Sequence, residues 1–338
     1  MRSLPTAMNL ASTIYALRWL VNDTFRQSLA SKVFWIMLSV SALTIVFCLS
    51  VSIDGGTVVD EGQLFDAKTG RDIVGPNPNP GKMTLLFGAM PVSIHRGGAE
   101  EVRLIHLFLA VWVAGAVGLL LTLVWTASFV PEFLQPSSAV VLLSKPVPRW
   151  AFLFGKYIGV VLFVALQGML FFVGTWAALG VKTGIWNNAY LLGWPMLVLQ
   201  FAVFYSLSLL IAVTWRSTMA CVLGILLFWI ICFGVNYGRY AMLALPTLAP
   251  QEVRPLSPLT RGLMETGYWA LPKPADFMMM LEDLLDAEKD KATLSSMPEF
   301  RHGRENGLFQ PFASMAASLA FGVVMIVLAG RQLNETEY

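Results

Sequence analysis

Charged residues and cysteines are both scarce in this chain of 338 residues. Asp, Glu, Lys and Arg make up 13% of it, whereas a soluble domain has about 25%. The three cysteines, Cys48, Cys221 and Cys232, lie in apolar segments, where a thiol behaves as a small hydrophobic group. The low charge excludes an ordinary soluble domain, and the cysteines imply no disulfide or metal framework.

Recognisable catalytic motifs are absent as well. Gly155-Lys156 lacks both the upstream glycine of a P-loop and the Ser or Thr that follows its lysine, so the chain has no ATP site of that kind. The histidines form neither H-E-x-x-H nor a Cys/His ligand spacing; they are His95, His106 and His302. His106 lies at the edge of an apolar stretch and is expected to be an interfacial residue. We therefore expect no enzyme activity, no metal and no cofactor in this chain.

Long stretches without Asp, Glu, Lys or Arg are what the sequence does contain. Each is long enough for a helix across the bilayer core, which needs about 20 residues. Strands of a closed membrane barrel are about 10 residues long and alternate in polarity, which excludes that fold here. We predict an all-α polytopic membrane protein with six transmembrane helices at residues 33–53, 104–130, 157–181, 189–215, 217–238 and 311–330.

The distribution of charge predicts the orientation of these spans. With the N-terminus in the cytoplasm, the inner segments 1–32, 131–156, 216 and 331–338 carry nine basic and four acidic residues. Basic residues in short loops are typical of the cytoplasmic side. We expect both termini in the cytoplasm, a location in the plasma (inner) membrane, and two extracytoplasmic segments at 54–103 and 239–310.

The two outer segments differ in their patterns. In the first, glycines and prolines separate short strand candidates, which are Gln63–Phe65, Asp72–Val74, Met83–Phe87 and Val92–Ile94. In the second, Pro274 can start an amphipathic helix over 274–289. Its apolar stripe includes Phe277 and Leu281 and faces away from Glu282, Asp286 and Asp290. That helix is expected to rest on the membrane or on a partner.

The N-terminal segment 1–32 predicts an amphipathic helix in the membrane interface. Apolar residues recur every three or four positions and so share one helical face; they are Leu10, Ile14, Leu17, Val21, Phe25 and Leu29. Arg18 and Arg26 lie off this face, and Trp19 is expected at headgroup depth.

Prolines and basic residues mark the loop 131–156. Ser137 or Ser138 can cap a short helix, which Pro146 would end, and Pro148 suits the first turn of the next helix. Such a segment across the mouth of two spans is either a lever for a soluble partner or an ordinary interfacial loop.

Within the spans, the few polar residues are expected to bridge helices, so any path would be apolar and suit a lipid-like or amphipathic cargo.

Three features together resemble a type 2 ATP-binding-cassette (ABC) transporter permease. They are the interfacial helix, the six-span layout, and Leu142-Leu143-Ser144-Lys145-Pro146 followed by Arg149 and Gly155-Lys156. The resemblance implies a permease subunit, with export favoured, driven by ATP and Mg on a separate ABC ATPase subunit. It also implies pairing with a second copy or a homologous permease. The residues it assigns to the ATPase contact are Glu132, Ser144, Lys145, Pro146, Arg149 and Lys156, with Arg18, Trp19 and Arg26 on the interfacial helix.

Two other functions compete with transport. One is a non-transporting membrane scaffold or receptor whose outer segments bind a ligand or an extracytoplasmic accessory protein. The other, an intramembrane enzyme, is disfavoured by the missing catalytic groups. Nothing in the sequence points to nucleic acid, and the substrate-binding residues stay unassigned.

Overall fold

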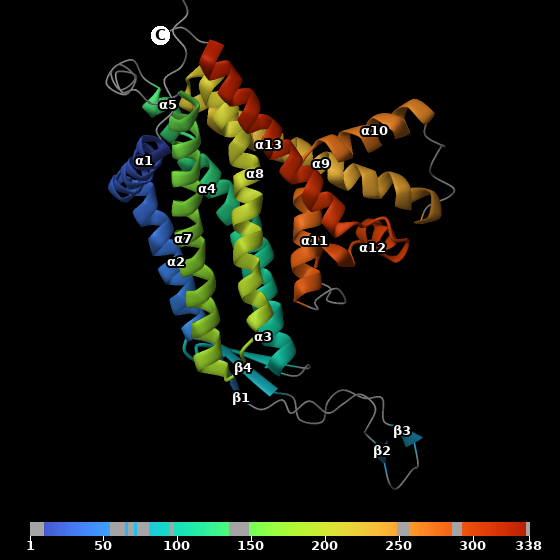
Figure 1. Cartoon of the computed structure of the whole chain (residues 1–338). Helices are drawn as coiled ribbons and strands as arrows, with labels where there is room; N and C mark the ends of the chain where they lie inside the picture. The colour runs from blue at the N-terminus through green and yellow to red at the C-terminus, as the bar shows by residue number, and fades with distance from the viewer. Residues whose placement is uncertain are drawn as a thin grey trace, which may run out of the picture.

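The computed structural model describes residues 10–54, 65–66, 71–72, 81–94, 98–134, 149–248, 257–285 and 293–335 (Figure 1). The helices in chain order are α1 (Leu10–Ala30), α2 (Lys32–Leu49), α3 (Gly98–Leu107), the π-helix η1 (Phe108–Gly118), α4 (Leu119–Thr126), α5 (Phe129–Phe133), α7 (Arg149–Thr183), the 3-10 helix η2 (Asn188–Leu192), α8 (Gly193–Trp215), α9 (Thr218–Leu248), α10 (Pro258–Ala270), α11 (Pro274–Leu284), the 3-10 helix η3 (Leu294–Ser296), α12 (Pro298–Glu305) and α13 (Pro311–Glu335). The strands are β1 (Ser52–Asp54), β2 (Phe65–Asp66), β3 (Arg71–Asp72), β4 (Gly81–Leu85) and β5 (Met90–Ile94).

Six helical stretches in the described part of the chain are long and apolar enough to cross a membrane. They confirm the predicted all-α architecture with six candidate spans. Their bounds are Lys32–Leu49, Gly98–Phe133, Trp150–Thr183, Asn188–Trp215, Thr218–Thr247 and Pro311–Glu335.

The second of these stretches contains an uncommon π-helical segment, η1. A Cβ on Gly115 would lie 2.9 Å from the carbonyl oxygen of Ala110, and one on Gly118 would lie 2.9 Å from that of Val113. The two glycines therefore permit the wider winding that a larger residue would oppose. π-helical turns within α-helices are frequently found at functional sites.

The fifth span extends further than its composition predicts. The sequence places its end at 238, but α9 runs to Leu248 and passes Arg239 without interruption. Arg239 is paired with Glu265 on α10 at 3.1 Å, so its charge is compensated inside the fold. Tyr240 and Ala244 beyond it are fully buried. Packing against α10 and α12 thus extends the helix beyond the uncharged run.

A small three-stranded antiparallel sheet has the order β1-β4-β5, with Met83 opposite both Ile53 and Val92. A separate antiparallel pair joins β2 and β3, where Phe65 lies opposite Asp72. The four strand candidates predicted in the first outer segment are therefore confirmed as β2, β3, β4 and β5, with bounds shifted by at most two residues, whereas β1 was not predicted. Figure 1 shows the three-stranded sheet at one end of the bundle, and α1 and α5 at the other.

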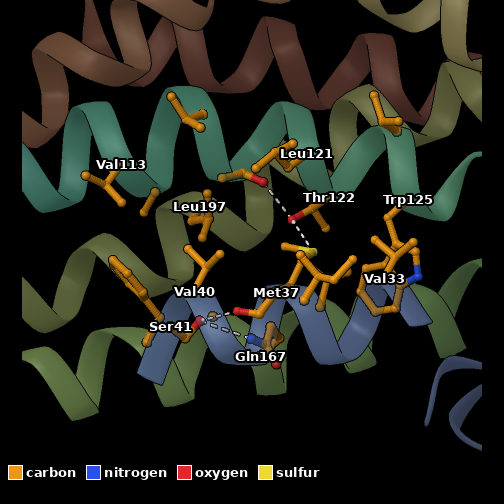
Figure 2. A pocket seen from close by; sticks show the side chains of 18 of the residues that line it. Val33, Met37, Val40, Ser41, Val113, Leu121, Thr122, Trp125, Gln167 and Leu197 are labelled. Carbon is orange, nitrogen blue, oxygen red and sulfur yellow. Dashed lines mark hydrogen bonds between the residues drawn. The ribbon is translucent and has the colours of Figure 1, made fainter. Parts of the chain in front are cut away.

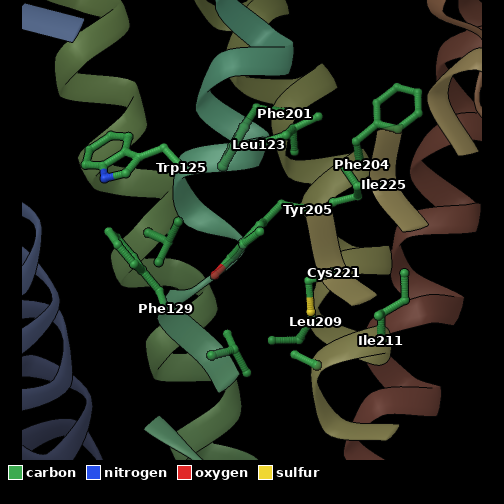
Figure 3. Packing of buried hydrophobic residues seen from close by; sticks show 14 of the residues in the cluster. Leu123, Trp125, Phe129, Phe201, Phe204, Tyr205, Leu209, Ile211, Cys221 and Ile225 are labelled. Atoms are coloured by element: carbon green, nitrogen blue, oxygen red, sulfur yellow. The ribbon is translucent and has the colours of Figure 1, made fainter. Parts of the chain in front are cut away.

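Buried side chains form two hydrophobic clusters along the bundle. The one nearer α1 and α5 packs aromatic rings between α4, α5, α8 and α9 (Figure 3). Within it, Tyr205 stacks on Phe201 with 5.3 Å between ring centroids and on Tyr157 with 5.8 Å. The other cluster joins η1, α7, α9 and α11 near the sheet. Together they hold the spans in a fixed arrangement around the sites described next.

Candidate functional site

A buried ammonium group ties α7 to α1 at the end of the bundle away from the sheet. Lys156 on α7 is only 1% exposed. Its Nζ donates a hydrogen bond of 2.6 Å to Oε1 of Gln27 and lies 3.5 Å from Oδ2 of Asp23, both on α1. Because an unpaired buried charge is strongly unfavourable, these partners fix where α1 lies on α7.

Gln27 also reaches the end of the second span. Its Nε2 donates to Oε2 of Glu132 on α5 over 3.0 Å, and the ring of Phe133 lies 5.5 Å from Nζ of Lys156. A cation at this distance from an aromatic face is attracted to it. We call Asp23, Gln27, Glu132 and Lys156 the junction network; it joins three elements that are distant in sequence.

Close packing supports the junction network. A Cβ placed on Gly159 of α7 would lie 2.8 Å from Oγ1 of Thr24 on α1. Thr24 is fully buried and donates to the carbonyl oxygen of Leu20 over 2.8 Å. Small residues at a crossing let two helices approach closely. The packed face of α1 thus carries Leu20, Thr24 and Ser28, whereas Leu29, predicted on the apolar face, is exposed.

The residues predicted to contact the ATPase differ in their burial, and some of them lie outside the described part of the chain. Glu132 is exposed and Lys156 is buried within the junction network. Ser144, Lys145 and Pro146 lie outside the described residues, as does the short helix predicted before them. Arg149 is the first residue of α7, and its side chain is not described. Arg18, Trp19 and Arg26 are exposed on α1.

Sequence reasoning missed Asp23 and Gln27 as site residues. Asp23 is the one acidic residue between Arg18 and Arg26, which is the only signal that could have singled it out. Gln27 carries no such signal, because its partners are 105 and 129 residues away in the chain.

A cavity of about 410 Å³ lies between α2, the η1–α4 stretch and α7 (Figure 2). Its walls are apolar, with Val40, Val113 and Leu121 among them. Gln167 on α7 donates to Oγ of Ser41 on α2 over 3.1 Å, and this pair forms the buried polar part of its floor. A mostly apolar cavity of this size with one placed polar pair is typical of a site for a small or chain-like apolar ligand.

A second buried polar cluster lies in the segment predicted to be extracytoplasmic. Asp276 on α11 is fully buried and accepts hydrogen bonds from three hydroxyl groups. The donors are Tyr268 at 2.6 Å, Tyr240 at 3.1 Å and Ser314 at 2.5 Å. These residues come from α9, α10, α11 and α13, so one carboxylate holds four helices together.

Cations complete this cluster. The guanidinium of Arg239 lies 4.1 Å from the ring centroid of Tyr268 and pairs with Glu265. The ammonium of Lys273 lies 4.8 Å from the same ring and 5.1 Å from that of Trp269. Burial lowers the pKa of Lys273 to about 8, and nearby Asp276 opposes that shift. Burial, followed by the charge of Asp276, raises the pKa of Tyr268.

The structure corrects the expected role of the helix at 274–289. Its described part, α11, is a packed helix inside the fold and not an amphipathic helix on the surface. Glu282, predicted on the polar face, is fully buried and accepts bonds from the backbone N–H groups of Leu294 and Ser295 and from the Ser295 hydroxyl. Burial raises the pKa of Glu282, and these donors oppose the shift. Asp286 and Asp290 lie outside the described residues.

The prediction for His106 is also wrong. The residue is fully buried, and its ring centroid lies 4.3 Å from that of Tyr190. Both of its ring nitrogens lack a hydrogen-bond partner among the described residues. Groups of three or more metal-ligating side chains are absent from the described part of the chain.

Comparison with known proteins adds no relationship: no protein-family model matches the chain, and no curated protein matches it significantly.

Proposed function

We propose that this chain is the membrane-spanning permease subunit of an ABC transporter, in which ATP hydrolysis on a separate subunit moves a substrate, with export favoured. The observation that carries the proposal is the junction network. Glu132 and Lys156 stand near the two ends of the loop 131–156, and Gln27 binds both of them. A force on that loop would therefore act on α1, α5 and α7 together.

The proposal assigns a place to each part of the chain. The loop 131–156 and the exposed face of α1 lie in the cytoplasm against the ATPase, and the sheet lies on the other side of the plasma membrane. Lys145 and Arg149 then supply cations to carboxylates of the ATPase, a kind of pair that can couple by about 1.5 kcal/mol or more. A second copy of the chain, or a homologous permease, completes the path.

Co-purification tests this function directly. The wild-type chain, extracted in mild detergent from its native membrane, should bring down an ATPase subunit, and the complex should hydrolyse ATP. Lys145→Ala combined with Arg149→Ala should lose the subunit while inserting normally. Lys182→Ala, an exposed lysine at the opposite end of α7, is the matched control and should retain it. A wild-type chain that captures no ATPase would favour a membrane scaffold or receptor.

A further inference from the structure

A second hollow lies along α2, nearer the sheet than the cavity of Figure 2. It has a volume of about 670 Å³ and lies between the sheet end of α2, α3 with η1, and the β4–β5 hairpin. The two hollows share Val113, and between them they follow α2 from Ser31 to Ser50. Helix α2 packs along α7 but makes few contacts with η1 and α4 in the described part of the chain. We call these two adjacent hollows together the α2 groove.

The length of the α2 groove matches the apolar interior of a membrane. Helix α2 has 18 residues, which span about 27 Å at about 1.5 Å per residue. The hydrocarbon core of a bilayer is about 30 Å thick. The groove opens sideways, because Ile36, Leu43 and Val117 on its rims are 60%, 71% and 57% exposed. Its mouth therefore faces the lipid, not the aqueous phases.

The polar groups of the α2 groove bond to the chain itself. Gln167 donates to Ser41, and the Ser41 hydroxyl donates to the carbonyl oxygen of Met37 over 3.0 Å. Thr122 donates to the carbonyl oxygen of Gly118 over 2.7 Å. A polar ligand would have to break these bonds, at the cost of leaving polar groups unpaired in an apolar site. A hydrocarbon chain would leave them intact.

The sheet end of the α2 groove is covered by an apolar hairpin tip. Leu86 and Phe87 have φ angles of 53° and 57°, a conformation uncommon for bulky residues. Ser50, at the end of α2, accepts two hydrogen bonds from this tip. The backbone N–H of Leu86 donates to the Ser50 hydroxyl over 3.1 Å, and the backbone N–H of Phe87 donates to the Ser50 carbonyl oxygen over 3.3 Å. These two bonds hold the strained tip over the groove, where Leu86 and Phe87 line it.

The opposite end of the α2 groove offers a cation. Lys32 is exposed and lies between Ser31 and Val33, which both line the groove. A lysine at headgroup depth attracts an anionic phosphate by about 1 kcal/mol. We propose that the α2 groove binds an acyl chain of a bilayer phospholipid, with its phosphate near Lys32 and the chain running toward the Leu86–Phe87 tip. This site does not depend on the proposed transport function.

Photolabelling of the purified chain in nanodiscs tests the site without any ATPase. The probe is phosphatidylglycerol with a photoreactive acyl chain, in a phosphatidylcholine bilayer. Label should concentrate on peptides of α2 and Gly98–Phe133. Val117→Trp, which fills the groove, should lower that label at least fivefold. Val323→Trp on α13 should leave it unchanged, because Val323 is 60% exposed and lies outside the groove. Leu121→Trp, on another wall, provides a second filled variant if the first is poorly folded.

Two outcomes would overturn the proposal. Equal labelling of α2, α9 and α13, unaffected by both tryptophan variants, would mean ordinary contact with bulk lipid. Disulfide formation between copies carrying Ile36→Cys, with no lipid label in the groove, would mean that a helix of a second copy occupies it.

Discussion

Gln27 on α1 and Lys156 on α7 are joined by a hydrogen bond of 2.6 Å that spans 129 residues of sequence. The same amide donates to Glu132, so one neutral side chain connects an ammonium and a carboxylate. Gln27 is therefore the residue on which the junction network depends, although it carries no charge itself.

Replacing Gln27 with Leu should destabilise the fold by about 1–3 kcal/mol, because it leaves the buried ammonium of Lys156 without its nearest acceptor. Thermal unfolding in detergent measures the effect. Asn22→Leu changes an exposed residue of the same helix and should shift the melting temperature little. An equal shift in both variants would contradict a specific role for Gln27.

Gly159→Ala should push α1 away from α7, since its methyl group would lie 2.8 Å from Oγ1 of Thr24. We expect a loss of about 1–3 kcal/mol, as for other overpacked sites. The matched control is Gly234→Ala on α9, where the added Cβ has no neighbour within 4 Å beyond the local backbone of its own helix; it should be neutral or stabilising by up to about 1 kcal/mol. Unfolding of both variants under identical conditions separates steric contact from helix propensity.

Stability should depend on pH through Lys273. Its pKa is about 8 in the fold against an ordinary value of 10.5. Between these values the unfolded chain binds more protons, so the free energy of unfolding should rise with pH, by about 3 kcal/mol in total.

Lys273→Met removes this contribution, so the free energy of unfolding of wild type should rise from pH 7 to pH 10 relative to that of the variant. Parallel pH dependences for the two proteins would show that Lys273 titrates normally.

Single cysteines should report the orientation of the chain. Phe87, at the hairpin tip, is 71% exposed, and Trp215, at the end of α8, is 65% exposed. Phe87→Cys should react with an impermeant thiol reagent on intact cells, and Trp215→Cys only after the membrane is permeabilised. The native cysteines are buried and provide a low background. The reverse pattern would place the loop 131–156 outside and rule out its contact with a cytoplasmic ATPase.

The sequence by itself determined the six candidate spans, because an uncharged run of about 20 residues has few stable alternatives to a membrane helix. It also predicted the positions of β2 to β5, where glycine, proline and alternating residues act locally, but it predicted neither β1 nor the order of the three-stranded sheet. The start of α11 at Pro274 follows from the same local chemistry.

Tertiary structure alone decided which polar residues are buried. Glu282 and Asp276 look like members of an exposed polar face, yet both are fully enclosed because donors from other helices and from η3 surround them. Lys156 looks like a surface cation of a loop, yet it lies under α1. Periodicity describes one helix at a time, whereas the free energy of burying a charge depends on partners brought from elsewhere in the chain. The α2 groove is likewise decided by tertiary packing, because it exists only where α2 stands apart from η1 and α4.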